Sequence, residues 1–172
     1  MFNKIKTLSI FFFCCCVILI IHSCGSKPAV GMDKELLDMA NDPTGFTWFK
    51  HSDAFLHKSE GSTHPKPWLR TRFNAIASAM LDADGKVIKG TVFPEGSMIV
   101  KEMFDDDKVS GLYSILYKNS SNEFADKKGW VWATLNMDGT VRESASNKGN
   151  ACINCHSEVN NIDFILMNKY FP

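Results

Sequence analysis

The sequence has no excess of charge of either sign, and cysteine is almost absent from most of its length. Its 19 Lys and Arg residues balance 19 Asp and Glu residues, so the charge gives no reason to expect nucleic acid as a partner. Four of the six cysteines occur in the first 24 residues, and only Cys152 and Cys155 follow them. With no internal repeat or later low-complexity tract, the 172 residues suffice for one domain with a hydrophobic core.

The two later cysteines form a C-x-x-C-H motif with His156, the pattern that attaches a c-type haem. Thiols three positions apart, Cys152 and Cys155, can form thioethers to the two vinyl groups of one porphyrin, and His156 can bind the iron. A redox C-x-x-C pair usually lies near a βαβ pattern, which we do not find, and a zinc site needs a second ligand pair. Haem c, with its iron bound by His156, is therefore the expected cofactor.

A targeting signal is expected at the amino terminus. Lys4 and Lys6 precede an apolar run over residues 8–21, which is typical of a secretory signal rather than a membrane-spanning helix. The residues up to Cys24 resemble a bacterial lipobox, which implies cleavage before Cys24 and a lipid on it; an uncleaved anchor helix is the alternative. Because haem c is attached outside the bacterial cytoplasm, we expect a lipoprotein of the cell envelope that faces the periplasm or the exterior.

Three parts are predicted along the chain: a signal peptide at 1–23, a tether with a short helix at 24–45, and a haem c domain at 46–172. The tether contains serine, proline and two glycines, which favour flexibility. Its helix is expected over 33–41, with Asp33 as the cap.

Alternation of apolar and polar residues predicts strands over 98–104, 112–117 and 129–135, with a hairpin turn at Asp138. Short connections between these strands favour antiparallel pairing. A helix capped by its first residue is predicted over 74–81. The expected fold class is α+β, mostly an antiparallel β-sheet with flanking short helices and a c-type haem near the carboxyl end.

One predicted strand carries a charge on an otherwise apolar face. Within 98–104, Ile99, Lys101 and Met103 share one face. Such a lysine lies either at a sheet edge, where its amine reaches water, or inside for a purpose. The pattern alone favours the edge, because lysine is seldom fully buried.

The second axial position of the haem has several candidate ligands. Only sixteen residues follow His156, and their one methionine, Met167, is too near to pass around the haem. We therefore expect the upstream strands to build the distal side, with an open or weakly occupied sixth site, which favours chemistry at iron over simple electron transfer. Polar flanks favour solvated loops for the upstream histidines. The residues that could still bind iron there are His51, His57, His64, Met98 and Met103.

Four segments, in this order, resemble the cytochrome P-460 family, which includes the β-sheet cytochromes c′. They are 93–102, with its Gly-Ser-x-x-Val-Lys-Glu sequence, the tryptophan-rich 129–134, the haem motif at 152–156, and 163–171. They span roughly the last hundred residues, the size of a small domain. The resemblance implies a mostly antiparallel β fold, often dimeric, with five-coordinate haem c whose proximal ligand is His156.

The resemblance also bears on the distal side. In members that oxidise hydroxylamine, the lysine of the Val-Lys-Glu segment is bonded to the porphyrin; here it is Lys101, which reverses the edge expectation. Those members place a carboxylate over the iron from the next strand, but residues 111–118 contain no Asp or Glu, and Ser114 or Tyr117 is expected to face the pocket instead. A neutral hydroxyl is no base at neutral pH, so nitric oxide binding is favoured over hydroxylamine oxidation.

The expected function is that of a lipid-anchored haem c protein that binds or oxidises small nitrogen species, nitric oxide or hydroxylamine. A redox partner protein and a homodimer are also expected, and whether the protein is an enzyme is left open. The alternatives are a non-enzymatic gas-binding or electron-transfer cytochrome c, or a structural lipoprotein with a redox or zinc C-x-x-C pair.

Overall fold

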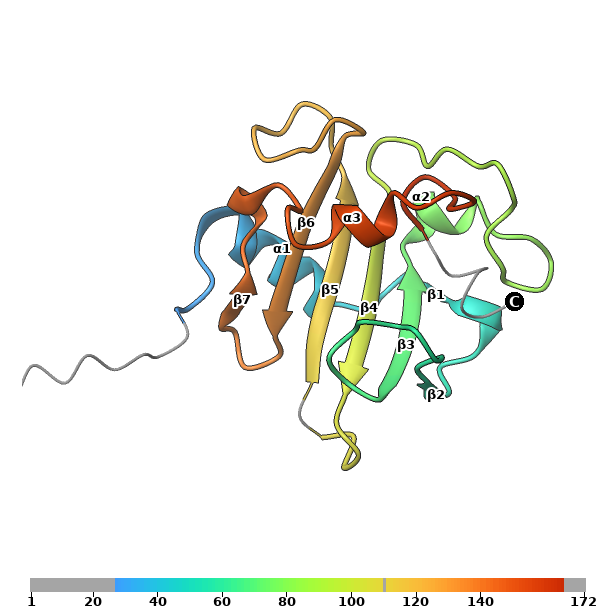
Figure 1. Cartoon of the computed structure of the whole chain (residues 1–172), viewed down its shortest axis with the longest axis horizontal. Helices are drawn as coiled ribbons and strands as arrows, with labels where there is room; N and C mark the ends of the chain where they lie inside the picture. Colours follow the sequence, from blue (N-terminus) through green and yellow to red (C-terminus); the bar gives the residue numbers. More distant parts are fainter. Residues whose placement is uncertain (1–26, 110, 166–172) are drawn as a thin grey trace, which may run out of the picture.

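The computed structural model, drawn in Figure 1, describes residues 27–109 and 111–165. The predicted signal peptide, the predicted lipidation site Cys24, and Met167 lie outside the described residues. Among the described residues, no helix is both long enough and apolar enough to cross a membrane.

One antiparallel sheet organises the domain. Its four long strands are neighbours in the order β3, β4, β5 and β6, and three short strands extend it, with β1 and β2 both paired to β3 and β7 paired to β6. Together with a few short helices, this arrangement confirms the predicted α+β class. The strands are β1 (Thr47–Trp48), β2 (Leu56–His57), β3 (Trp68–Phe73), β4 (Met98–Phe104), β5 (Gly111–Lys118), β6 (Trp130–Asn136) and β7 (Val141–Glu143).

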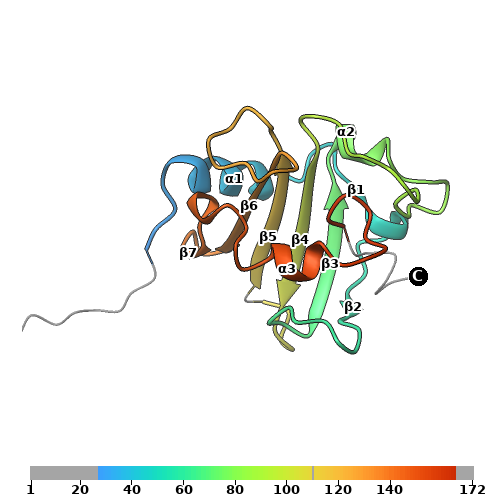
Figure 2. The same ribbon diagram turned by 45° about the horizontal axis from the view of Figure 1, so that its top comes forward.

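The helices lie on opposite sides of the sheet, as Figure 2 shows. Helix α1 packs on one face through the fully buried Leu36 and Ala40. Helix α3 and the chain after it pack on the other face, which presents Ile99 and Trp132. The helical segments are α1 (Gly31–Asn41), α2 (Ala75–Ser78), α3 (Ile153–His156) and two short 3-10 turns, η1 (Phe49–His51) and η2 (Ala145–Asn147).

The predicted helix caps have different outcomes. Asn74 caps α2 as predicted, by accepting a hydrogen bond from the Ala77 amide at 2.9 Å. This helix is shorter than predicted because Leu81 already pairs with Val87 in a β-bridge. Asp33 is not a cap, since α1 begins at Gly31.

Asp33 instead ties α1 to the chain before the haem motif. Its buried carboxylate accepts hydrogen bonds from the Ser144 hydroxyl and the Ala145 amide, both at 2.7 Å. These two residues begin η2, which precedes α3 in the chain. The first helix therefore helps to fix the start of the segment that carries the motif.

Glu102 of β4 is buried on the α1 side between two arginines of β3. Its carboxylate accepts hydrogen bonds from Arg70 Nε at 2.7 Å and from Arg72 Nε at 2.9 Å. Arg72 is 1 % exposed and also donates to the carbonyl of Ala40 in α1. The network therefore joins two central strands to the helix, and each buried charge has a partner of opposite sign.

We expect Glu102→Gln to lower the stability of the fold by about 3 kcal/mol, because it leaves a buried arginine without its counter-charge. In a chain of this size, the melting temperature should fall by about 10 °C, measured by circular dichroism. The matched control is Glu95→Gln, which alters an exposed carboxylate bonded to Ser120 and should shift the melting temperature by less than about 3 °C. Equal shifts for the two variants would contradict this account of Glu102.

Candidate functional site

A cavity of about 410 Å³ lies between α3, the sheet and the loop of residues 61–65. Its volume is within the range of small-molecule and cofactor sites. It brings together the haem motif and the sheet face that carries Lys101, which are separated by about fifty residues in the chain. The side chains that line it include His64, Lys101, Met103, Ser114, Thr134, Arg142, Glu143, Cys152, Cys155, His156 and Glu158.

Strand register places a polar row across the cavity face of the sheet. Thr71, Lys101, Ser114, Thr134 and Glu143 are successive partners on β3, β4, β5, β6 and β7. Side chains directly opposite one another on antiparallel strands point to the same face. The row therefore supplies hydroxyls, one amine and one carboxylate to a single surface.

Lys101 lies on the central strand β4, so the edge position favoured by the pattern alone is wrong. Its Nζ is 3.1 Å from Nε2 of His64, and as an ammonium it donates this hydrogen bond. Burial lowers the pKa of Lys101 to about 8. Near neutral pH the amine thus keeps a fraction of its neutral form, which is the nucleophilic one.

The two distal candidates on β5 have different outcomes. Ser114 lines the cavity. Tyr117 does not, because residues three apart on a strand point to opposite faces. Its ring packs into the core cluster beneath α1, so the prediction that it faces the pocket is wrong.

The C-x-x-C-H motif forms α3, a single turn whose cysteines and histidine lie on the cavity wall. Cys152 and Cys155 are both free thiols. Burial raises the pKa of Cys152 to about 11, whereas the attacking cysteine of a redox pair has a lowered pKa. Burial thus disfavours the thiolate of Cys152, the form that a redox pair would need at that position.

His156 is prepared to bind a metal through one nitrogen. Its Nδ1–H donates to the carbonyl of Phe164 at 2.6 Å, so the proton is on Nδ1 and the Nε2 lone pair is free. Burial lowers the pKa of His156 to about 4, which keeps the imidazole neutral at pH 7. In residues 27–109 and 111–165, no group of three His, Cys, Asp or Glu side chains is placed to hold a metal ion.

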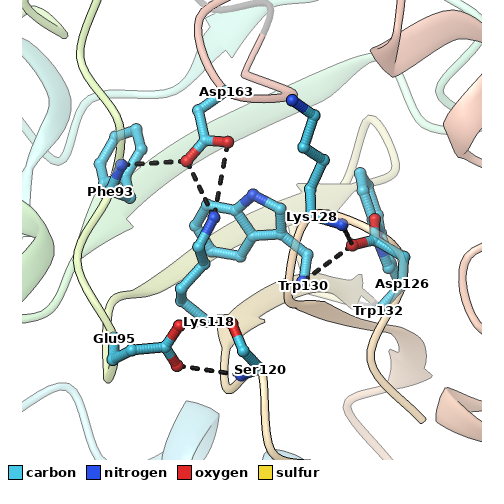
Figure 3. Close-up of polar contacts among 9 residues, drawn as sticks. All are labelled: Phe93, Glu95, Lys118, Ser120, Asp126, Lys128, Trp130, Trp132 and Asp163. Carbon is cyan, nitrogen blue, oxygen red and sulfur yellow. Dashed lines mark hydrogen bonds and ion pairs between the residues drawn. The ribbon is translucent and has the colours of Figure 1, made fainter.

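Trp132 of β6 supports the imidazole of His156. The two ring centroids are 5.1 Å apart and the planes are at 85°. Asp126 fixes the indole by accepting a hydrogen bond from its Nε1 at 2.8 Å, and the two side chains are drawn in Figure 3. Gly149 lies so close that a Cβ there would be 2.6 Å from Trp132 Cδ1, so only glycine fits.

We predict that Gly149→Ala is more destabilising than Gly139→Ala. Both glycines have a positive φ, 71° and 90°, so alanine costs roughly 1–2 kcal/mol of backbone strain at either position. At Gly139 the added Cβ meets nothing nearer than 3.8 Å, whereas at Gly149 it clashes with Trp132 and should cost about 1–3 kcal/mol more. Urea unfolding of the two variants measures the difference, and equal losses would contradict the close packing on Trp132.

A buried ion pair fastens the chain that follows α3, as Figure 3 shows. Lys118 Nζ lies 3.1 Å from Asp163 Oδ2 and 4.7 Å from the ring centroid of Trp130. The same carboxylate accepts a hydrogen bond from the Phe93 amide at 2.9 Å. Asp163 and Phe164 have positive φ values of 46° and 69°, an uncommon backbone that these contacts hold in place. The carbonyl of Phe164 is thereby set to accept from His156.

We expect Asp163→Asn to loosen residues 157–165, because it leaves the ammonium of Lys118 buried without a counter-ion. Hydrogen exchange followed by mass spectrometry should show exchange in this segment accelerated by about tenfold or more. Asp38→Asn is the control, since its pair with Lys34 is exposed and should matter little. Unchanged exchange in residues 157–165 would show that the ion pair does not hold the segment.

The histidines upstream of the sheet differ in position. His51 and His57 are exposed, as predicted, although they end η1 and β2 and do not lie in loops, and their ring nitrogens are 3.2 Å and 3.0 Å from backbone carbonyls. His64 is half-buried and lines the cavity, so for this residue the prediction is wrong. Burial lowers the pKa of His64 to about 2, and the charge of Lys101 acts in the same direction.

Sequence reasoning missed the charged residues at the cavity rim. Arg142 and Glu143 come from the short strand β7, and Glu158 follows α3. The predicted hairpin turn at Asp138 could have indicated Arg142 and Glu143, because it returns the chain beside the tryptophan-rich strand β6. Glu143 raises the pKa of Cys152 and Glu158 acts on His156, so both carboxylates lie toward the α3 side of the cavity.

Residues 71–167 match the family model for cytochrome P-460. The chain belongs to the cytochrome P-460 family. No curated protein and no solved structure gives a significant match. Membership implies a haem cofactor, and the matched range contains both the sheet row from Thr71 to Glu143 and the motif in α3. His64 lies before this range.

Proposed function

We propose that the protein is a c-type haem protein that binds small nitrogen species, chiefly nitric oxide, on the side of the haem iron opposite His156. The observation that carries this proposal is the shared cavity, in which two free thiols and an unprotonated imidazole nitrogen face the Lys101 row of the sheet. Family membership supports the haem, and the thiols of Cys152 and Cys155 support its covalent attachment.

The residues fit haem c in number and chemistry. Cys152 and Cys155 would hold the porphyrin through thioethers, His156 would bind the iron through Nε2, and Arg142 offers a cation to a propionate. The haem, when bound, supplies a coordination site for a small ligand and a one-electron redox centre. The chain supplies the orientation of the imidazole through the carbonyl of Phe164.

The part of the sheet row beside Lys101 favours binding over oxidation, because the one carboxylate of the row, Glu143, lies three strands away on β7. β5 contributes Ser114 and no carboxylate to the cavity face, and the hydroxyl of Thr134 lies beside it. Hydroxyls can donate a hydrogen bond to a bound ligand but cannot take a proton from hydroxylamine at neutral pH. The amine of Lys101 belongs to the same row, so a bond between it and the porphyrin, as the resemblance implies, is part of the proposal.

An electron-transfer role is the second candidate. It is favoured by the exposure of Asn154, between the two cysteines, because an exposed attachment edge gives electrons a short path to a partner protein. The lipid on Cys24, the location in the cell envelope and a homodimer complete the proposal, and these three rest on the sequence.

We expect the full chain, produced with haem-attachment machinery, to carry haem that survives denaturation. The double variant Cys152→Ala with Cys155→Ala should lose it completely, because no thioether can form, whereas the neighbouring Ser157→Ala should keep it. Haem staining of a denaturing gel and the mass of the intact chain measure the difference. A wild-type chain without covalent haem would overturn the proposal.

Ligand addition to the same preparation separates the candidate activities. Nitric oxide should change the absorption spectrum, while hydroxylamine should leave the oxidised haem unreduced and release no nitrous oxide. Reduction with nitrous oxide release would replace binding by oxidation, and no response to nitric oxide would favour electron transfer. A broad Soret band shifted far to the red would indicate that Lys101 is bonded to the ring.

A further inference from the structure

The loop of residues 58–67 holds His64 over the cavity. The Lys58 amide donates to the carbonyl of Pro67 at 2.8 Å and closes the base of the loop, next to the pairing of β2 with β3. Lys58 Nζ also donates to the carbonyl of His64 at 2.9 Å. Both contacts hold backbone atoms, so they fix the position of His64 while its ring lines the cavity.

The imidazoles of His64 and His156 are neighbours in an edge-to-face arrangement. Their ring centroids are 6.3 Å apart and their planes are at 87°. Two imidazoles bound to opposite sides of one metal ion, with metal–nitrogen bonds of about 2.0 Å, have centroids about 6 Å apart. The observed separation therefore matches the one that a shared iron requires.

The Nε2 atom of His64 has the lone pair that such a bond needs. It accepts the hydrogen bond from Lys101 Nζ at 3.1 Å, so it is unprotonated. A neutral imidazole nitrogen is a common ligand of haem iron. The amine of Lys101 and the iron would both use the lone pair of His64 Nε2. Binding of iron by His64 would therefore replace its hydrogen bond with Lys101.

Other donors upstream of the motif are less suited to the position. Met103 is 1 % exposed and its side chain belongs to an apolar cluster of the sheet. Both His51 and His57 are exposed and turned to backbone carbonyls outside the cavity. His64 is thus the donor best placed to reach iron from the side opposite His156.

We propose that His64 is the second axial ligand of the haem in the ligand-free protein, and that a small ligand binds iron by displacing it. This inference rests on the proposed function, because it requires a haem held by His156. It adds what family membership does not supply, since His64 lies outside the matched residues 71–167. Without an added ligand, His64 would occupy the sixth coordination site of the iron. A small ligand would then bind by taking the place of His64.

The test compares spin states and binding rates in the haem-loaded full chain. The wild-type oxidised protein should be low-spin by absorption and electron paramagnetic resonance, and His64→Leu should be high-spin. His57→Leu, which alters an exposed histidine at the base of the same loop, should stay low-spin. Carbon monoxide should bind the reduced His64→Leu protein about tenfold faster than the wild type. This factor corresponds to His64 occupying the iron in roughly nine of ten wild-type molecules, a state that the variant cannot form.

A second variant separates ligation from folding. His64→Gly should be high-spin, and free imidazole should return it to the low-spin form by taking the place of the side chain. Either of two results would overturn the assignment of His64: high-spin iron in the wild type, or low-spin iron in His64→Leu. Both results would leave the proposed function intact. A chain with no covalent haem would overturn both.

Discussion

Alternation along β4 is the constraint on which the site depends. Consecutive residues of a strand point to opposite faces, so Lys101 enters the cavity while Glu102 enters the layer beneath α1. Each then has the partner that its face provides, His64 for the amine and the two arginines of β3 for the carboxylate. A shift of register by one residue would exchange these environments and bury each charge beside the wrong partner.

Three carboxylates hold the cavity wall in place. Asp33 joins α1 to the segment before the motif, Asp126 fixes the indole that packs on His156, and Asp163 anchors the segment after the motif. None of them lines the cavity. They act as positioning groups, because an imidazole on a single helical turn needs neighbours to set its direction.

The sequence was informative wherever a local pattern decides the structure. Alternation identified β4, β5 and β6, and the spacing of Cys152 and His156 identified the wall opposite the sheet. Long-range contacts were not accessible in this way. His64 is flanked by polar loop residues, and its burial depends on a loop that follows the two-residue strand β2 and is closed by the hydrogen bond from Lys58 to Pro67. Tyr117 is three residues from Ser114 on β5, and because side chains alternate between the faces of a strand, it points to the α1 side and not into the cavity.

The clamp made by Asp33 also determines where the folding unit begins. The family match starts at Thr71, yet the fully buried Leu36 and the carboxylate of Asp33 belong to α1, about forty residues earlier. A fragment cut at the family boundary would leave the face of β5 and β6 uncovered and the amide of Ala145 without its acceptor. The range matched by the family is therefore smaller than the unit that this chain needs to hold the C-x-x-C-H motif in place.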